Sequence, residues 1–195
     1  MYKLEKGKPW IFWPDSICST FPENPGNKIL DGSKSFKFSL DIVLEEIGEN
    51  KQTIFSILPS YMGLDIQDNS SVFVYTLDSK PHSFNIANSS IPINEKAIIL
   101  LEYIYKQSLS LKINGKIVFL KMLNGSTLGY DSSPHIILGS GNFPKNGFNL
   151  NYSSYLINEF KLFDENKCIS HHNFKEFIHD KSFDLTNNCN FLHKL

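Results

Sequence analysis

The chain has 195 residues, of which 41% are hydrophobic and 13% aromatic, and its formal net charge is -1. This much apolar material can build a large core, so an intrinsically disordered chain is excluded. No stretch concentrates Lys or Arg, which argues against nucleic acid as a partner, because phosphate binding needs a dense basic surface.

Residues 1–34 carry much Pro and Gly and one short candidate strand at 10–13, so they are predicted to form a lead-in packed on the domain that follows. The basic N-terminus is not followed by an apolar core of signal-peptide length, and the longest apolar run, Ala97–Leu101, is too short to span a membrane. We therefore expect no membrane insertion, and a protein that is cytoplasmic, part of a larger assembly, or exported without an N-terminal signal.

From Ser35 onward, apolar and polar residues alternate with a period of two, which is typical of strands with one buried face. The first of these strands is expected at 36–44. The run 96–105 is the most apolar, and we expect it to be a strand buried on both faces. Further strands are expected at 53–58, 64–66, 72–77, 82–87, 108–113, 116–121, 136–139 and 155–163.

Asn114-Gly115 separates the strands at 108–113 and 116–121. Asn and Gly accept positive φ at both central positions of a turn, so this dipeptide predicts a type I′ hairpin. With the other strands, it completes about ten strands at spacings of roughly 8–12 residues, a pattern that favours an all-β sandwich.

The C-terminal region is expected to differ from the rest. Ser170 can cap a helix, and Phe174, Phe177 and Ile178 would then fall on one face. The sequence therefore predicts a short helix near 171–180 and a docked tail, which together make up 169–195.

Four stretches, in order, resemble the laminin G-like and concanavalin A-like jelly rolls of lectins and glucanases: 36–43, 110–118, 136–139 and 156–164. The resemblance implies an antiparallel two-sheet jelly roll over 35–168, within a single domain overall. Two departures indicate a divergent member. Glu95-Lys96 stands where many relatives have Trp before the central strand, and Ser153-Ser154 where many have Gly before the last one.

Glucanases of this fold use Glu-x-Asp-x-x-Glu on one strand, because a retaining mechanism needs two carboxylates about 5 Å apart. The nearest match here is 41–46, in which Asp41 and Glu45 share a face but Val43 replaces the central carboxylate. Glu159 stands alone on the last strand. The sequence therefore predicts no glycosidase activity and no enzyme.

Metal ligation finds little support in the pattern. Of His171, His172 and His179, only His172 and His179 would share a helical face, and their spacing of seven residues is too wide for paired ligands on one turn. Calcium stays an alternative, because oxygen-bearing residues gather in two turns, without the twelve-residue loop pattern. These turns hold Asp65, Asp68 and Asn69, and Asn124, Asp131 and Ser132. Cys18, Cys168 and Cys189 lack Cys-x-x-Cys spacing and are predicted to be thiols, although one disulfide among them stays open.

Sugar binding needs an aromatic face beside groups that bond hydroxyls. Trp10 and Trp13 are possible platforms, and the long loops supply others. The predicted site comprises Tyr130, Asp131, Asn142, Phe143, Lys145, Asn146 and Tyr152. In the alternative, Phe143 and Phe148 only close the end of the core.

These patterns favour a non-catalytic, lectin-like module that binds a glycan or a glycosylated surface. The alternative is an accessory or assembly domain that contacts a protein partner or a second copy of itself. An exposed aromatic patch with polar neighbours would favour the first, and a flat apolar surface the second.

Overall fold

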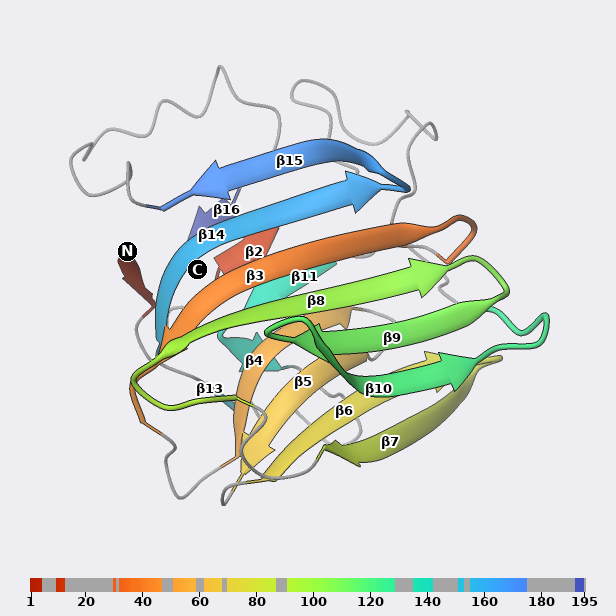
Figure 1. Cartoon of the computed structure of the whole chain (residues 1–195), viewed down its shortest axis with the longest axis horizontal. Coiled ribbons are helices and arrows are strands. Elements are labelled where there is room, and N and C mark those ends of the chain that lie inside the picture. The colour runs from red at the N-terminus through yellow and green to blue at the C-terminus, as the bar shows by residue number, and fades with distance from the viewer. Residues whose placement is uncertain are drawn as a thin grey trace.

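The protein is a β-sandwich in a computed structural model (Figure 1). The structure describes residues 1–4, 10–12, 30, 32–46, 51–58, 62–67, 70–86, 91–128, 135–141, 151–152, 155–174 and 192–194. Every regular element in these ranges is a strand. The strands are β1 (Tyr2–Leu4), β2 (Trp10–Phe12), β3 (Phe36–Leu44), β4 (Gln52–Leu58), β5 (Met62–Gln67), β6 (Ser70–Leu77), β7 (Lys80–Ile86), β8 (Lys96–Ile104), β9 (Ser108–Ile113), β10 (Lys116–Met122), β11 (His135–Leu138), β12 (Ser140–Gly141), β13 (Asn151–Tyr152), β14 (Tyr155–Asp164), β15 (Lys167–Asn173) and β16 (Leu192–Lys194).

Two antiparallel sheets form the two layers. Sheet A has the order β14-β3-β8-β9-β10, with β1 and β15 both pairing with the outer edge of β14. Sheet B has the order β16-β2-β11-β4-β5-β6-β7, and β12 pairs with β13 as a separate ribbon. In Figure 1 the outer face of sheet A is toward the viewer and sheet B lies behind it. The two-sheet antiparallel sandwich that the sequence predicts is therefore confirmed.

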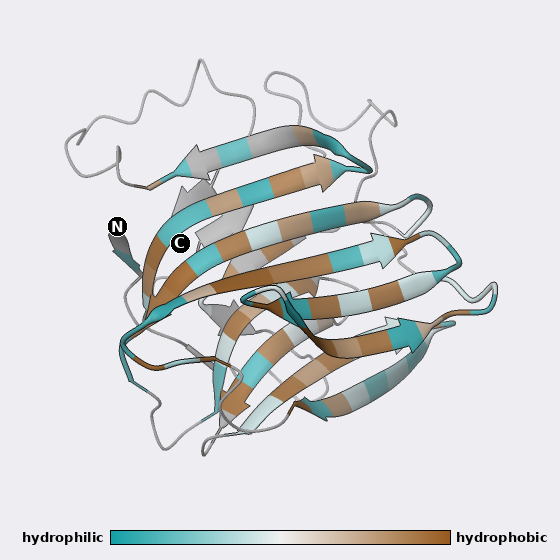
Figure 2. Cartoon of the chain, viewed as in Figure 1, coloured by the Kyte–Doolittle hydropathy of each residue, from teal (hydrophilic) through white to brown (hydrophobic). Residues whose placement is uncertain are grey.

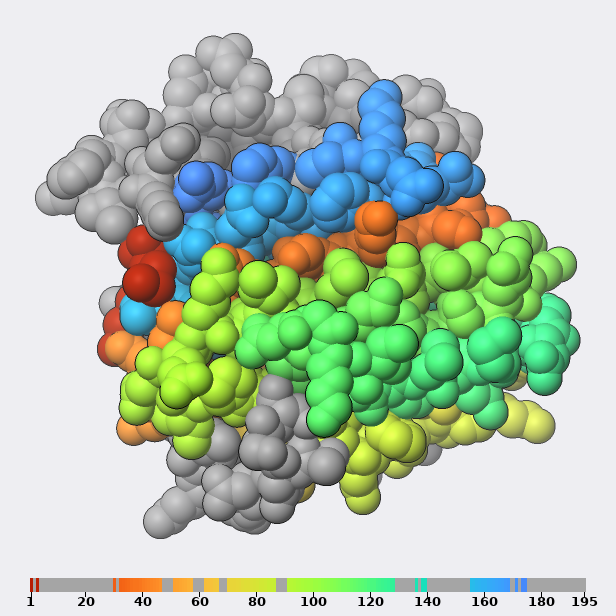
Figure 3. Space-filling view, in the orientation of Figure 1, coloured from red at the N-terminus to blue at the C-terminus, as the bar shows by residue number. Residues whose placement is uncertain are grey.

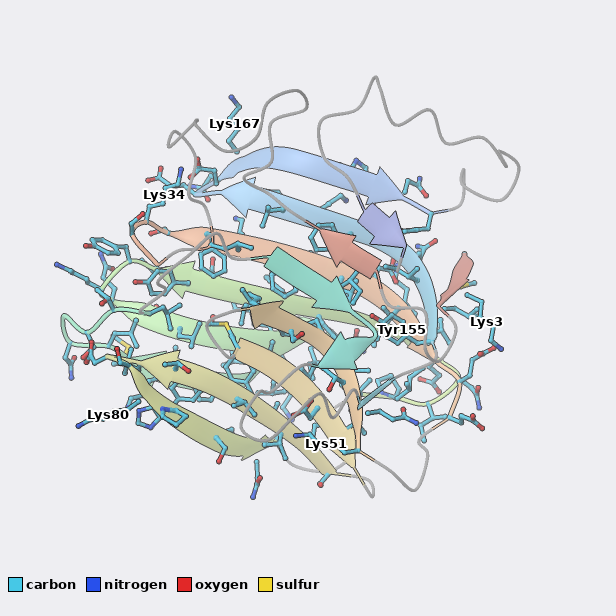
Figure 4. The ribbon with its side chains drawn as sticks, turned by 180° about the vertical axis from the view of Figure 1, so that it is seen from behind. Lys3, Lys34, Lys51, Lys80, Tyr155 and Lys167 are labelled. Carbon is cyan, nitrogen blue, oxygen red and sulfur yellow. The ribbon has the colours of Figure 1, made fainter. Side chains whose placement is uncertain are left out.

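The core lies between the sheets because alternate side chains of each strand point inward. On β3 the inward residues Phe36, Phe38 and Leu40 are buried. The Phe38 ring meets Phe55 of sheet B edge-on, with centroids 4.8 Å apart, and burial of each such ring contributes roughly 1.5–3 kcal/mol. Tyr155, labelled between the layers in Figure 4, joins the sheets by donating its hydroxyl to the Ile54 carbonyl at 2.7 Å.

The prediction that 96–105 is buried on both faces is wrong. β8 alternates strictly: Ala97, Ile99 and Leu101 are buried, whereas Ile98 and Ile104 are exposed. Sheet A packs against sheet B on one side only, so Ile98 and Ile104 face solvent although they are as apolar as the buried Ile99. These exposed residues become part of a surface described below.

The predicted helix near 171–180 is wrong over the residues that the structure describes. β15 continues through Asn173 and pairs with β14, with His171 opposite Lys161 and Ser170 opposite Leu162. Phe174 follows in a turn and is buried in the core. Strand pairing along β14 therefore outweighs the local helix signal, and residues 175–180 lie outside the described residues.

The Asn114-Gly115 turn is confirmed. The φ angles are 50° at Asn114 and 78° at Gly115, both positive as a type I′ turn requires. Asn114 also fixes the turn to β8 through two hydrogen bonds with Ile98, each 2.8 Å long. The side-chain oxygen of Asn114 accepts from the Ile98 backbone amide, and the backbone amide of Asn114 donates to the Ile98 carbonyl.

Cys168 is exposed and is not part of a disulfide, whereas Cys18 and Cys189 lie outside the described residues. Within the part of the chain that the structure describes, no helix is long and apolar enough to cross a membrane.

Candidate functional site at the open edge of the sandwich

Most of the predicted sugar-binding residues lie outside the described residues: Tyr130, Asp131, Asn142, Phe143, Lys145 and Asn146. Tyr152 is placed through its backbone, which pairs with Ser140 between β13 and β12. Trp10 belongs to β2 and pairs with Leu138, and Trp13 lies outside the described residues. The predicted loop site therefore stays a prediction, and the candidate site is built from other residues.

Five rings meet where β6 and β7 of sheet B approach β10 of sheet A, one of them the fully buried Phe73, whose centroid lies 4.9 Å from that of Phe119. We call Tyr75, His82, Phe84 and Phe119 the edge cluster. The rings of Tyr75 and His82 stack at 15° with centroids 5.2 Å apart. The Phe119 ring lies 5.1 Å from both Tyr75 and Phe84, which joins the two sheets at this edge.

The β6–β7 hairpin brings these rings together. Its turn residues, Asp78 and Ser79, have φ angles of 46° and 62°, so the turn has two central residues with positive φ. Tyr75 and His82 are equally far from this turn, and the strands pair them directly. Alternation then places Phe84, paired with Phe73, on the same inward-facing side of sheet B as Tyr75.

The edge cluster combines a buried base with an exposed rim. Tyr75 and Phe119 are buried, whereas the Phe84 side of β7 is open to solvent and Phe84 itself is 43% exposed. Burial raises the pKa of the Tyr75 hydroxyl, so this group stays neutral at ordinary pH. Residues 80–85 of β7 are all exposed, and alternation places the polar side chain of His82 on the same face as the Phe84 ring, with Ser83 and Asn85 on the other face.

A second surface lies on the outer face of sheet A. Its large aliphatic side chains are between 38% and 58% exposed. We call this set the outer strip: Ile98, Ile104, Ile117, Leu120 and Met122. Figure 2 shows many hydrophobic residues on β8 and β10. Figure 3 shows the side chains of these strands on the lower half of this face. The strip consists of two rows, on β8 and on β10, separated by the outward-facing Ser108, Ser110 and Lys112 of β9. Exposed apolar surface often marks an interaction surface.

The other half of the outer face carries compensated charges. Asp41 of β3 accepts hydrogen bonds from Lys96 and Asn158, each at 2.8 Å. Glu159 of β14 bonds Lys161 at 2.8 Å and His171 at 2.7 Å. The Lys161 hydrogen bond, with a further one from His171, lowers the pKa of the Glu159 carboxyl.

The pairing of β14 with β3 places Glu159 directly opposite Asp41, so Glu159 does have a second carboxylate near it. Glu45, which the sequence pattern places on the same strand face as Asp41, follows the end of β3 and pairs with Lys3 at 2.9 Å. A retaining glycosidase needs one carboxyl with a raised pKa to act as the acid. Glu159 has the opposite shift, which suits an ion-paired surface.

Asp65 does have a raised pKa, mainly because burial disfavours its charged form. It lies on β5, where it accepts a hydrogen bond from Thr53 at 2.6 Å and forms an ion pair with Lys51 at 2.7 Å. Its predicted calcium partners, Asp68 and Asn69, lie outside the described residues, as do Asp131 and Ser132. Among the residues that the structure describes, no group of three or more His, Cys, Asp or Glu could hold a metal ion.

No protein-family model and no curated protein matches the chain. The fold is similar to that of a mutant of HCR/D, with a TM-score of 0.56 and 16% identity over 86% of this chain and 40% of that one. It is similar to the binding domain of botulinum neurotoxin serotype D, with a TM-score of 0.52 and 15% identity over 74% of this chain and 36% of that one.

A third similar structure is the binding domain of botulinum neurotoxin DC in complex with rat synaptotagmin II. Its TM-score is 0.50 and its identity 16%, over 72% of this chain and 34% of that one. The chain therefore spans well under half the length of each of these structures. At such low identity the likeness shows the fold alone.

Proposed function

We propose that the chain is a non-catalytic, lectin-like binding module that holds a carbohydrate against the edge cluster. The observation that carries this proposal is the half-exposed ring of Phe84, supported from behind by Phe119 and bordered by His82. Pyranose rings present an apolar face of C–H groups that packs on aromatic rings, while polar neighbours bond the hydroxyls.

Two further observations support this proposal. Two of the structures with a similar fold are binding domains, of botulinum neurotoxin serotype D and of botulinum neurotoxin DC. The two carboxylates that the sheet brings together, Asp41 and Glu159, are occupied by lysine partners rather than poised for acid–base chemistry.

The test is a glycan-array screen with the purified chain and two variants. Phe84→Leu keeps an apolar side chain but removes the aromatic face, and we expect it to lose most of the binding. Tyr105→Ala is the matched control, because Tyr105 is an exposed ring outside the edge cluster. The proposal fails if the chain binds no glycan, or if Phe84→Leu and Tyr105→Ala bind as well as the unaltered chain.

The loop site that the sequence predicts stays a separate proposal for the location of the same function. Asn142→Ala and Tyr152→Ala, screened on the same array, decide between the two locations. A loss confined to these variants, with Phe84→Leu unaffected, would assign the ligand to the loop.

The outer strip favours a second candidate function, contact with another protein chain. Its side chains are aliphatic and lie on one face of β8 and β10, which fits a flat interface better than a sugar site. If a second copy covers this strip, sedimentation equilibrium should show self-association that Leu120→Lys and Met122→Lys abolish. A chain that is monomeric at every concentration would exclude a homo-oligomer through this face.

A further inference from the structure

Three lysines of the outer face of sheet A form ion pairs within the protein. Lys96 pairs with Asp41, Lys112 with Glu102, and Lys161 with Glu159. Each of these positive charges is neutralised by a carboxylate within 3.1 Å. They are therefore poorly placed to attract an external anion.

The lysines beside the edge cluster are different. None of the ion pairs among the described residues involves Lys80 of β7 or Lys121 of β10. Both side chains are exposed. We call these two residues the edge lysines.

The strand geometry places both edge lysines at one end of the edge cluster. Lys80 lies two residues before His82 on β7, and Lys121 lies two residues after Phe119 on β10, so each shares a strand face with a ring. The Asp78 amide donates to the Thr127 carbonyl at 3.1 Å, which ties the turn before β7 to the segment after β10. Figure 1 shows the beginning of β7 and the end of β10 at the same end of the sandwich.

The nearest carboxylate on this hairpin, Asp78, does not form an ion pair with Lys80. Its side chain accepts a hydrogen bond from the Thr127 amide at 3.2 Å. The Ser126 side chain and this amide lower the pKa of the Asp78 carboxyl, and the nearby charge of Lys80 adds a smaller lowering, so Asp78 stays ionised. Two exposed lysines that form no ion pair among the described residues thus lie at one end of the edge cluster, with His82 between Lys80 and the exposed Phe84 ring.

We propose that the carbohydrate taken by the edge cluster is acidic, with a carboxylate or sulfate group that the edge lysines bind while a sugar ring packs on Phe84. This inference rests on the proposed function, because it assigns the ligand class of the same site. A charge-assisted hydrogen bond from an ammonium to an oxyanion is stronger than a neutral one, so acidic sugars should be preferred over neutral parents.

A different role is also known for lysines on edge strands, which discourage edge-to-edge association of sheets. In that case the lysines would protect solubility and would not affect ligand choice. The two roles predict different losses on substitution, and one set of variants separates them.

The experiment measures the affinities for lactose, sialyllactose and sulfated lactose by titration calorimetry. The variants are Lys80→Gln and Lys121→Gln, which keep a long polar side chain but remove the charge. Lys167→Gln is the control for net charge, because Lys167 is exposed and lies far from Lys80 in Figure 4. Phe84→Leu reports on the ring contact.

We expect the unaltered chain to prefer the two acidic sugars, and each edge-lysine substitution to weaken only those, by about fivefold. Salt should weaken the same two interactions. Lys167→Gln should change nothing. Phe84→Leu should weaken all binding.

Equal affinity for lactose and the acidic sugars, or no binding of the acidic sugars, overturns the inference. Aggregation of the edge-lysine variants with an unchanged preference for acidic sugars also overturns it and assigns the lysines to edge protection. The proposed function is judged separately on the array, where binding of neutral glycans that depends on Phe84 would uphold it even if this inference fails.

Discussion

Sheet A differs between its β14 side and its β10 side. On the β14 side, charges such as Glu159 and Lys161 neutralise one another, and the inward rings are sealed in the core. On the β10 side, Lys121 has no ion pair among the described residues, and the buried Phe119 ring contacts the exposed ring of Phe84. Partners that satisfy one another stabilise the fold, whereas unsatisfied groups gathered at an edge are available to a ligand. The comparison therefore separates scaffold from candidate site.

The largest expected effect contrasts one ring from each region. Phe38→Ala removes a fully buried ring that packs on Phe55 and Phe160, and should cost about 3–5 kcal/mol of unfolding free energy. Phe84→Ala should cost about 1 kcal/mol or less, because much of that ring already faces water. Urea denaturation measures both. Equal losses would mean that Phe84 belongs to the core, and the comparison would fail.

The next effect tests the turn that holds β10 at the edge. Gly115→Val forces a β-branched residue to a φ of 78°, at a cost of roughly 1–3 kcal/mol. A Cβ at this position meets no atom within 4 Å, so the cost comes from the backbone alone. Gly115→Asn is the control, since Asn tolerates this conformation. Melting temperatures should fall for Val and change little for Asn. A stable Gly115→Val protein would contradict the assigned turn.

A smaller effect concerns the paired charges of the β14 side. Lys161 and His171 lower the pKa of Glu159 from 4.5, so this group stabilises the fold above its unfolded pKa. That stability is lost as the pH falls through the lowered folded pKa. Compared with Glu159→Gln, the unaltered protein should melt higher at neutral pH and lose the advantage in acid. Melting temperatures measured from neutral pH to below 4.5 check this. A constant difference at every pH would mean that the pair does not act through charge.

Much of the fold is predictable from local patterns. The alternation at 36–44 predicts β3 with its bounds, and Asn114-Gly115 predicts a hairpin whose two turn residues do have positive φ. Both signals depend only on residues near one another in sequence. The hairpin at Asp78-Ser79, which pairs Tyr75 with His82, lacks the glycine that marks the Asn114-Gly115 turn, so the same signal did not identify it.

What sequence reasoning missed depends on contacts between distant residues. Ile98 is as apolar as Ile99, and only the position of sheet B decides which of them is buried. Glu159 meets Asp41 because β14 pairs with β3, and β15 forms because β14 offers a free edge that overrides the helix signal after Ser170. The edge cluster was missed because Phe119 joins it from the other sheet.

The smallest expected effect is on stability, and it tests the comparison most directly. Lys161→Gln breaks a pair with Glu159 and should lower the unfolding free energy by about 0.2–1 kcal/mol. Lys80→Gln and Lys121→Gln break no ion pair among the described residues, so they should change it by less than about 0.5 kcal/mol. Urea denaturation of the three variants at low salt measures the difference. If the edge lysines prove as important for stability as Lys161, they have partners within the fold, and the β10 side is scaffold like the β14 side. If they do not, their charges are free to act on a ligand.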